Sequence, residues 1–280
     1  MIQEEKGESL HFVKTNPSGN TTLLVLDEIP AERHKYLAPL LMDKNSLSAE
    51  QVAFLDTHPP RMCDIGIRMM GGEFCGNAVR SAAAWLVFDR CRWQPDLDMG
   101  YEAQFDVSCS GISHNVSCTV RQMSRHQFDV SAEMPLPLSI DEISIGGYSF
   151  CRVHLPGIVH FCLCGKETPD AETQQALIAE VLRTYPVQSG DAAGILFWNG
   201  HRLDPFVYVK DTDTLVHESS CGSGTAAVAA CLAYRLGGAV HIDASQAGGM
   251  IYGEAEKGEG IVSLRIGGLV EITAEGIAYV

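Results

Sequence analysis

The feature that most constrains the fold of this 280-residue chain is a weak internal repeat relating its two halves. In each half, a strand, a glycine-containing turn and a second strand precede a helix. A short strand and then a Cys-Gly sequence that opens another helix follow. Three pairs of positions mark the repeat: Gly19 with Gly157, Gln51 with Gly194, and Cys75 with Cys221. Their separations of 138, 143 and 146 residues increase slowly, as expected for a duplicated domain with small insertions.

The repeat predicts the same order of elements in both halves. In the first half we expect strands at 10–14, 22–26, 51–55 and 65–70, with a helix at 32–43. In the second half we expect strands at 148–153, 160–164, 194–198 and 215–217, with a helix at 171–183.

The helix that follows each Cys-Gly sequence has almost no polar face. Helices are expected at 78–89 and 225–236, and both are rich in alanine. A helix that is apolar on every side is buried on every side. We therefore expect an α/β (α+β) fold with two pseudo-symmetric domains, each a curved, mostly antiparallel sheet around a central helix. The domains are placed at 1–134 and 135–280, with a linker near Pro135-Leu136-Pro137. The last strand is expected either to stay in the second domain or to pair with strands of the first.

The position of Cys75 and Cys221 at helix starts suits acid–base chemistry. The first backbone N–H groups of a helix lack intrahelical partners and attract anions. Their partial positive charge also lowers the pKa of a nearby thiol. A small carboxylate bound between two such helix starts would have one sulfur on each side of its α-carbon. One thiolate would remove the α-proton while the opposing thiol returned a proton to the other face, which inverts the stereocentre.

Composition excludes several other classes of function. The chain carries 35 acidic and 20 basic residues, so its formal charge is −15. This balance disfavours nucleic-acid and anionic-membrane partners. The longest apolar stretches, at 82–88 and 226–233, are too short to span a membrane. The polar segment 1–11 does not resemble a secretory signal, so we expect a cytoplasmic protein.

No cofactor or metal is expected. The ten cysteines are interpreted as reduced thiols, and the Cys162/Cys164 pair as one face of a strand rather than a metal site. The glycine-rich pieces match no nucleotide-binding fingerprint, and no lysine context indicates a pyridoxal Schiff base. The histidines are given no special role. His217, the histidine nearest a motif, is expected to pack or to lie behind the site.

The ordered motifs resemble those of the diaminopimelate epimerase-like superfamily of cofactor-independent racemases. The motifs are Gly19-Asn20, Gln51, Cys75-Gly76-Asn77 and Cys221-Gly222-Ser223-Gly224-Thr225, in the family's order over nearly the whole chain. Within the superfamily, the resemblance is closest to the histidine racemases of staphylopine-type metallophore biosynthesis. The segments that carry it are 16–20, 50–52, 73–78, Glu218 and 220–225. The resemblance implies the two-domain fold, catalysis by both cysteines and an amino-acid substrate.

Three departures set the chain apart from true diaminopimelate epimerases. Ala78 stands where those enzymes usually have glycine after Cys-Gly-Asn. Residues 211–214 contain no arginine, whereas those enzymes carry a Glu-Arg pair upstream of the second cysteine. Residues 157–160 replace an Asn-Pro-His turn. Arginine is the residue best suited to hold a carboxylate, so a second amino-acid head group would lack its clamp. We expect a substrate with one α-amino-acid group, most readily histidine.

The resemblance also implies roles for residues beside the thiols. Asn20 and Gln51 match positions that contact substrate, and Gly76, Asn77, Gly222 and Ser223 are expected to donate hydrogen bonds to the α-carboxylate. Glu218 is expected to hold the α-ammonium or to be a helix-start acid that the helix dipole favours. Glu50 is expected to accept a hydrogen bond from an imidazole N–H or to be a solvated carboxylate.

Other interpretations stay open at this point. The chain is expected to form a homodimer. The main enzymatic alternative is diaminopimelate epimerase itself, and proline racemase-like enzymes fit the first motif less well. A related isomerase that works without a thiol pair is disfavoured by the presence of both cysteines. An alternative of another class is a non-catalytic metal or thiol sensor, which would bind stoichiometric zinc and unfold when chelated.

Overall fold

The computed structural model describes residues 8–93, 100–188 and 190–280. Most of the N-terminal segment used above to argue against a secretory signal, residues 1–7, lies outside the described residues. The chain divides into two compact units. Unit 1 comprises Met1–Ser131 and Leu269–Val280, and unit 2 comprises Ala132–Gly268. The final strand therefore contributes residues to both units. The division into domains at 1–134 and 135–280 stays a prediction.

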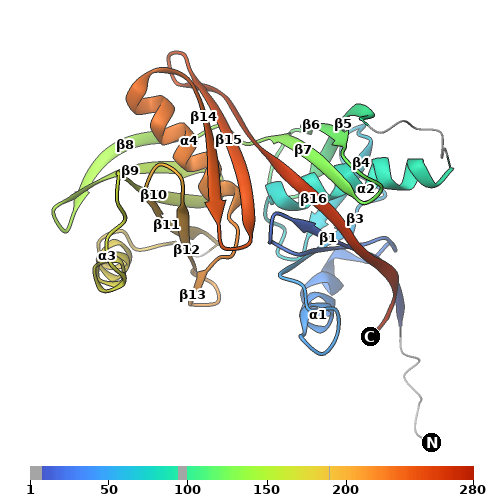
Figure 1. Ribbon diagram of the computed structural model, residues 1–280. Helices are drawn as coiled ribbons and strands as arrows, with labels where there is room; N and C mark the ends of the chain where they lie inside the picture. The colour runs from blue at the N-terminus through green and yellow to red at the C-terminus, as the bar shows by residue number, and fades with distance from the viewer. Residues whose placement is uncertain (1–7, 94–99, 189) are drawn as a thin grey trace, which may run out of the picture. The chain divides into compact units, whose positions relative to one another are not determined.

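Unit 1 is a curved sheet that encloses one helix. Its elements are β1 (Ser9–Pro17), β2 (Thr22–Val25), α1 (Ala31–Met42), β3 (Gln51–Leu55), β4 (Ile65–Met69), α2 (Gly76–Trp93), β5 (Glu102–Cys109), β6 (Val116–Gln122), β7 (Gln127–Glu133) and the end of β16 (Ile261–Tyr279). The strands lie in the order β1 to β7, and β16 pairs antiparallel with β1. The pairs β2–β3 and β4–β5 are parallel. Helix α2 contacts β1, β2, β4, β5 and β6 (Figure 1).

Unit 2 repeats this plan with a second buried helix. Its elements are β8 (Ser139–Ile145), β9 (Tyr148–Leu155), β10 (Ile158–Cys164), α3 (Ala171–Thr184), β11 (Ala192–Trp198), β12 (Leu203–Val209), β13 (Thr214–His217), α4 (Gly222–Leu236), β14 (Gly238–Gln246) and β15 (Gly249–Lys257). One sheet has the order β13-β12-β11-β10-β9-β8, and β14 and β15 pair with each other. Helix α4 contacts β9, β10 and β11 on one side and β14 and β15 on the other (Figure 1).

The central helices are buried because they are rich in alanine and have almost no polar face. In α4, Ala226 to Cys231 are all inaccessible to solvent, and in α2 the same is true of Ala82, Ala83 and Ala84. Small alanine side chains let strands approach a helix closely on several sides. Each outer helix instead buries one face: Leu37 and Leu41 of α1 pack on β3, and Leu177 and Val181 of α3 pack on β11. The predicted fold class is confirmed.

The structure refines the helix starts and shows where the repeat breaks down. Both central helices begin directly after the cysteine, at Gly76 and Gly222, rather than two or more residues later. The strand before α2 is largely buried, whereas all four residues of β13, the strand before α4, are exposed. A buried strand packs on both faces, while β13 is the edge of its sheet.

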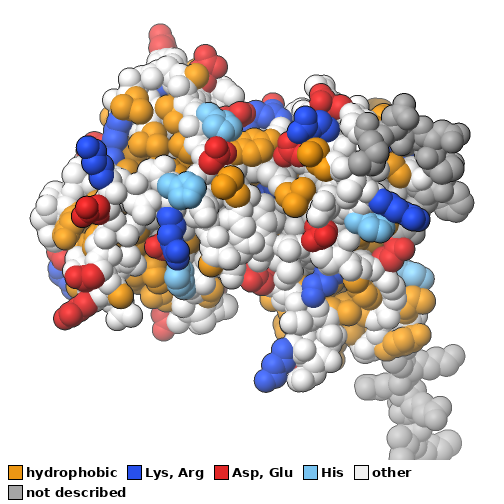
Figure 2. Space-filling view, in the orientation of Figure 1, with side chains coloured by type: hydrophobic (Ala, Val, Ile, Leu, Met, Phe, Trp, Pro, Cys, Tyr) orange, Lys and Arg blue, Asp and Glu red, His pale blue; other side chains and the backbone are white. Residues whose placement is uncertain are grey.

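No described helix is long and apolar enough to cross a membrane. On the face shown in Figure 2, Lys and Arg side chains are scattered among acidic, apolar and histidine side chains and do not gather into one patch.

Buried Arg80 provides a test of how unit 1 is held together. It is inaccessible to solvent, and its guanidinium donates to the carbonyl oxygens of Val130 (3.1 Å) and Leu269 (3.3 Å) and to Asn77 Oδ1 (3.2 Å). Arg80→Met keeps much of the volume but removes these three hydrogen bonds inside the core, although the Leu269 carbonyl oxygen still accepts from Ser18 Oγ. We expect the free energy of unfolding, measured in urea, to fall by roughly 2–5 kcal/mol.

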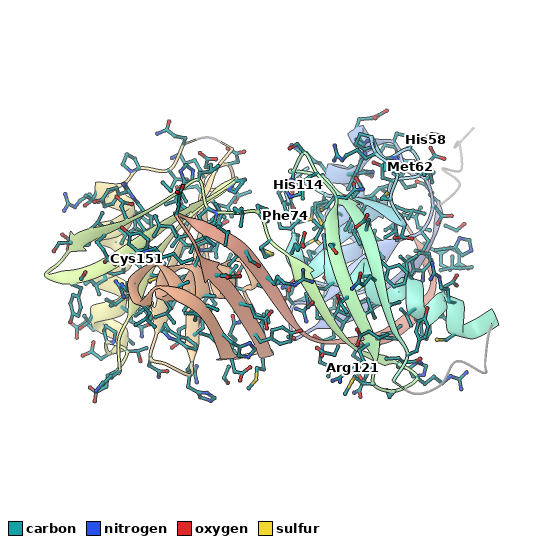
Figure 3. All side chains as sticks on the ribbon, turned by 90° about the horizontal axis from the view of Figure 1, so that it is seen from above. His58, Met62, Phe74, His114, Arg121 and Cys151 are labelled. Atoms are coloured by element: carbon teal, nitrogen blue, oxygen red, sulfur yellow. The ribbon has the colours of Figure 1, made fainter. Side chains whose placement is uncertain are left out.

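The matched control is Arg121→Met. Arg121, labelled in Figure 3, is half exposed, and its 3.8 Å ion pair with Asp129 is worth at most about 1 kcal/mol. Equal losses of stability in the two variants would contradict the role given to Arg80.

Candidate active site

Cys75 lies at the start of α2, where the helix supplies hydrogen-bond donors to its sulfur. The Ala78 N–H donates to Cys75 Sγ over 3.5 Å, and the Val79 N–H donates to the Cys75 carbonyl oxygen over 3.0 Å. The preceding residue, Phe74, is labelled in Figure 3. Gly111 packs against this turn so closely that a Cβ at position 111 would overlap the backbone of residues 73 and 74. The turn is thus held by the segment that follows β5 and by the first turn of the helix.

A network of amide and hydroxyl groups connects Cys75 to β2 and β3. The Cys75 thiol donates to Gln51 Oε1 over 3.1 Å. The Gln51 Nε2 group donates to Thr22 Oγ1 over 2.7 Å and also to Asn20 Oδ1. Because β2 and β3 are parallel with Thr22 opposite Gln51, the two side chains are brought together by strand register. The predicted residues Asn20, Gln51 and Cys75 therefore form one connected group.

Burial and a nearby carboxylate oppose ionisation of Cys75. Burial raises the pKa of the Cys75 thiol to about 11, and the charge of Glu73 adds to the increase, while the N–H groups of Ala78 and Asn77 act in the opposite direction. Cys109 on β5 lies next to it. Its sulfur accepts from the Cys75 N–H, and burial raises the pKa of Cys109 to about 12. Burial therefore favours the thiol form of Cys75 near neutral pH.

Cys221 is the N-cap residue of α4. Its sulfur accepts from the Gly224 N–H over 3.3 Å and lies 3.6 Å from Ser223 Oγ. A Cβ at Gly224 would crowd both this sulfur and Leu196, so the glycine permits the close approach. The predicted residues Gly222, Ser223 and Cys221 are thus parts of one helix start.

The pKa of the Cys221 thiol is raised well above its ordinary value. Burial is the largest cause, followed by the charge of Glu218 and a side-chain hydrogen bond with it. The hydroxyl of Ser223 and the N–H of Gly224 act in the opposite direction. Glu218, which was expected at the site, therefore lies beside the second thiol and opposes its ionisation.

His160 was not predicted among the residues near the thiols, and the structure places it beside Ser223. It is inaccessible to solvent, and its Nε2 lies 3.1 Å from Ser223 Oγ. Burial lowers its pKa to about 3, so the ring is neutral at physiological pH. His217, by contrast, is exposed and stacks on Phe206 with ring centroids 4.3 Å apart, as the packing interpretation predicted.

The signal that points to His160 is the glycine opposite it. His160 on β10 and Gly194 on the parallel strand β11 are register partners, and a Cβ at position 194 would overlap the imidazole ring. A glycine inside a strand often marks a close approach of this kind. The repeat had paired Gly194 only with Gln51. The register between β10 and β11, which shows what fills the space, is not apparent from either segment alone.

The remaining predicted residues lie near these two groups. Asn77 is buried, and its Oδ1 accepts from Arg80, while Gly76 is buried in the first turn of α2. Glu50 is exposed, and its N–H donates to the carbonyl oxygen of Thr21 over 3.0 Å. Asn20, Glu50, Gln51, Gly76, Asn77 and Cys75 belong to unit 1, whereas Glu218, Gly222, Ser223 and Cys221 belong to unit 2.

A separate group of thiols surrounds the far part of α4. Cys231 Sγ lies 3.8 Å from Cys164 Sγ, and Cys231 also contacts Cys151, which lies on β9 and is labelled in Figure 3. All ten cysteines are free thiols. Among the described residues, no group of three or more His, Cys, Asp or Glu side chains is arranged to hold a metal ion.

Sequence comparison relates the chain to one family. Residues 9–279 match the family model described as the histidine racemase CntK N-terminal domain. A histidine racemase of Fusobacterium nucleatum subsp. nucleatum is 34% identical over 286 residues, which cover 99% of both chains. A histidine racemase of Staphylococcus aureus is 28% identical over 225 residues, which cover 78% of each.

Solved structures show the same fold at low sequence identity. A PhzF-family phenazine biosynthesis protein of Bacillus anthracis has a TM-score of 0.62 at 11% identity, covering 98% of this chain and 100% of its own. A hydroxyproline epimerase of Agrobacterium vitis has a TM-score of 0.62 at 12% identity, covering 100% and 94%. At these identities the likeness concerns the fold alone.

The buried, neutral His160 predicts a pH dependence of stability. In the unfolded chain histidine binds a proton below its ordinary pKa of 6.5, whereas in the folded protein it does so only below about 3. Between these values the unfolded state binds more protons, so stability falls as the pH falls, by up to about 1.4 kcal/mol per pH unit. His160→Gln should therefore show a shallower loss of unfolding free energy between about pH 6 and pH 4.

The slopes, measured by urea unfolding at several pH values, are compared rather than the absolute stabilities. His201→Gln at an exposed position serves as the control and should keep the wild-type slope. An unchanged slope in His160→Gln would contradict burial of a neutral imidazole.

Proposed function

The chain belongs to the histidine racemase family, and we propose that it interconverts L-histidine and D-histidine with Cys75 and Cys221 as its two acid–base groups. No cofactor takes part in this proposal.

The observation that carries the proposal is the matched setting of the two thiols. Each cysteine lies at the start of a buried helix, and each sulfur accepts a backbone N–H from the residue three positions later, Ala78 or Gly224. A donor aimed at sulfur stabilises thiolate more than thiol. Each position can therefore hold the charged form when a base is needed, although burial favours the protonated form of both sulfurs.

In the proposed reaction, one cysteine is a thiolate and the other a thiol when the amino acid is bound. The thiolate takes the α-proton, and the carbon–hydrogen electron pair is left on the α-carbon as a carbanion. The opposing thiol then gives its proton to the other face of that carbon, which forms the new C–H bond. The first sulfur ends protonated and the second ends as thiolate, which is the form that reacts with the other enantiomer. Exchange of these protons with water restores the starting form for another turnover in the same direction.

The neighbouring residues have distinct proposed tasks. The first-turn groups of Gly76, Asn77, Gly222 and Ser223 bind the α-carboxylate, which helix starts favour. Glu218 holds the α-ammonium, and binding of that cation offsets the effect of Glu218 on the pKa of Cys221. Asn20 and Gln51 contact the substrate, and Gln51 Oε1 accepts from Cys75 while that cysteine is the thiol. Glu50 accepts the imidazole N–H.

Histidine is the proposed substrate for two reasons. The chain matches the histidine racemase family, and it lacks the arginine that a second amino-acid head group would need. Residues 211–214 offer no arginine for a second amino-acid head group. A substrate with a distal carboxylate and ammonium would bury those groups without partners here, and it would lose much of its binding energy. We further propose that the protein acts in the cytoplasm as a homodimer and that its D-histidine serves metallophore biosynthesis. The resemblance to the staphylopine-type racemases supports this.

Replacing either cysteine by serine tests the two-base mechanism. Serine is a far weaker acid than cysteine, so Cys75→Ser and Cys221→Ser should each lower the racemisation rate by about 10²–10⁴-fold. In heavy water, each variant should still exchange the α-proton of one enantiomer, because one base remains. The two variants should prefer opposite enantiomers, as measured by proton NMR with chiral chromatography.

Cys63→Ser is the control, because Cys63 lies outside both groups, and it should keep wild-type activity. Substantial racemisation by either active-site serine variant would rule out the two-thiol mechanism. Zinc at one equivalent in the purified protein, with unfolding on chelation, would instead support a metal-binding role.

The identity of the substrate is tested with a panel of L-amino acids in heavy water. We expect deuterium at Cα of histidine and none at either stereocentre of diaminopimelate. If Glu50 accepts the imidazole N–H, Glu50→Ala should lower kcat/KM for histidine by about 10–100-fold, which corresponds to a lost charged hydrogen bond. The decrease should be smaller for an amino acid without a ring.

Glu32→Ala, at an exposed position on α1, is the matched control and should leave kcat/KM unchanged. Efficient turnover of diaminopimelate with histidine inert would overturn the substrate assignment and leave the two-thiol mechanism standing. Equal losses for histidine and for smaller amino acids in Glu50→Ala would remove Glu50 from imidazole recognition.

A further inference from the structure

The end of the β14–β15 hairpin contacts the turn that carries Cys221. Gln246 is the last residue of β14 and lies opposite Gly249, the first residue of β15. The Cys221 N–H donates to Gln246 Oε1 over 2.7 Å, and the Gly248 N–H donates to the Ser219 carbonyl oxygen over 2.7 Å. A hairpin 25 residues downstream in the sequence thus holds the segment before α4 at two points.

Gln246 closes a ring of hydrogen bonds around Cys221. Its Nε2 donates to Thr225 Oγ1 over 3.1 Å, and Thr225 Oγ1 donates to the Cys221 carbonyl oxygen over 2.8 Å. Thr225 is inaccessible to solvent and Gln246 is 7% exposed, so these bonds are shielded from water. Only glutamine supplies an acceptor and a donor at this reach, since glutamate lacks the donor at neutral pH and asparagine is one methylene shorter.

The ring fixes the backbone that carries the sulfur. It binds both the N–H and the carbonyl oxygen of Cys221 and so fixes the peptide groups on either side of its Cα. With φ −119° and ψ 105°, this backbone sets the direction of the Cα–Cβ bond, from which Sγ reaches the Gly224 N–H. Because Gln246 already occupies the Cys221 N–H, the next helix-start donors along the chain are those of Gly222 and Ser223.

Unit 1 holds its own cysteine by a different device. There, Ser110 Oγ donates to the Glu73 carbonyl oxygen over 2.8 Å and accepts from the Met69 N–H over 2.9 Å. This bond fixes the turn two residues before Cys75 and leaves the Cys75 N–H to the sulfur of Cys109. The two thiols are therefore positioned independently, each from within its own unit.

We propose that Gln246 is a positioning residue for the racemase reaction, which holds the Cys221 sulfur in line with the Gly224 N–H and acts on Cys221 but not on Cys75. The inference rests on the proposed function, because it concerns the alignment of one of the two proposed bases.

The test separates the two bases by using single-cysteine backgrounds. In Cys75→Ser only Cys221 can exchange the α-proton of histidine in heavy water, and in Cys221→Ser only Cys75 can. Adding Gln246→Met to Cys75→Ser should lower the exchange rate by about 10–100-fold, which is the effect of losing alignment and a buried hydrogen bond. Adding it to Cys221→Ser should leave the exchange rate at saturating histidine within about twofold, because Cys75 is held from within unit 1.

A general loss of folding would lower exchange in both backgrounds and would overturn the proposal. No change in either background would overturn it as well. Gln246→Glu keeps the acceptor for the Cys221 N–H and should retain more exchange in Cys75→Ser than Gln246→Met does. Gln175→Met, an exposed glutamine on α3 of the same unit, is the matched control and should change neither rate.

A second readout does not depend on enzymatic activity. The rates at which iodoacetamide alkylates Cys221 and Cys75 are followed by peptide mass spectrometry between pH 7 and pH 9. In Gln246→Met the rate for Cys221 relative to Cys75 should fall at least about threefold, because a thiolate without its aligned N–H has a higher pKa. An unchanged ratio overturns the inference. If no histidine exchange occurs in any background while this ratio falls, the proposed substrate fails and the positioning role of Gln246 stands.

Discussion

A hydrogen bond from a helix-start N–H to a cysteine sulfur is the contact around which each unit is arranged. It requires the cysteine to be an N-cap and the helix to begin with small residues, here Gly76 and Gly222. It also needs exclusion of water, because an exposed N–H would bind solvent instead. The alanine-rich bodies of α2 and α4 meet that need, since strands pack on them from several sides. The same burial raises the pKa of both thiols, so the helix start and the surrounding core act in opposite directions on the charge of the sulfur.

In both units, a parallel pair of strands near the cysteine places one large side chain opposite a small one. The strand that carries the large side chain differs between the units. In unit 1 a small residue on β2, Thr22, lies opposite a large one on β3, Gln51, which reaches Cys75. In unit 2 the large residue is His160 on β10 and the small one is Gly194 on β11. Its ring reaches Ser223 rather than the sulfur itself. The large side chain thus comes from opposite strands of an equivalent parallel pair, which accounts for a large residue at position 51 where its repeat partner is glycine.

Patterns along the sequence predicted the elements whose formation depends on nearby residues. The four expected helices, the eight expected strands and the cysteine positions follow from apolar runs, turn residues and the repeat, and the structure contains them within a few residues. Strand β8 was not predicted. The contributions of His160 and Gln246 could not be found this way. Each depends on strand register or on a hairpin that folds back over a helix start, and a polar residue in an apolar strand shows no sign of its partner. The placement of Glu218 beside Cys221 lies between these cases: its nearness in sequence suggested the site, but only the contact shows that it opposes ionisation of the thiol.

The different surroundings of the two cysteines have a specific consequence if the chain racemises histidine as proposed. Enantiomers have equal free energies in water, so kcat/KM must be the same in both directions however unlike the two thiols are. Glu218 and Ser223 act on Cys221, and His160 contacts Ser223, whereas Gln51, Glu73 and Cys109 act on Cys75. This asymmetry must therefore appear in quantities that the equality of kcat/KM does not fix. One is the separate values of kcat and KM for each enantiomer. The other is the protonation state in which each enantiomer binds, because L- and D-histidine require the proton on opposite sulfurs.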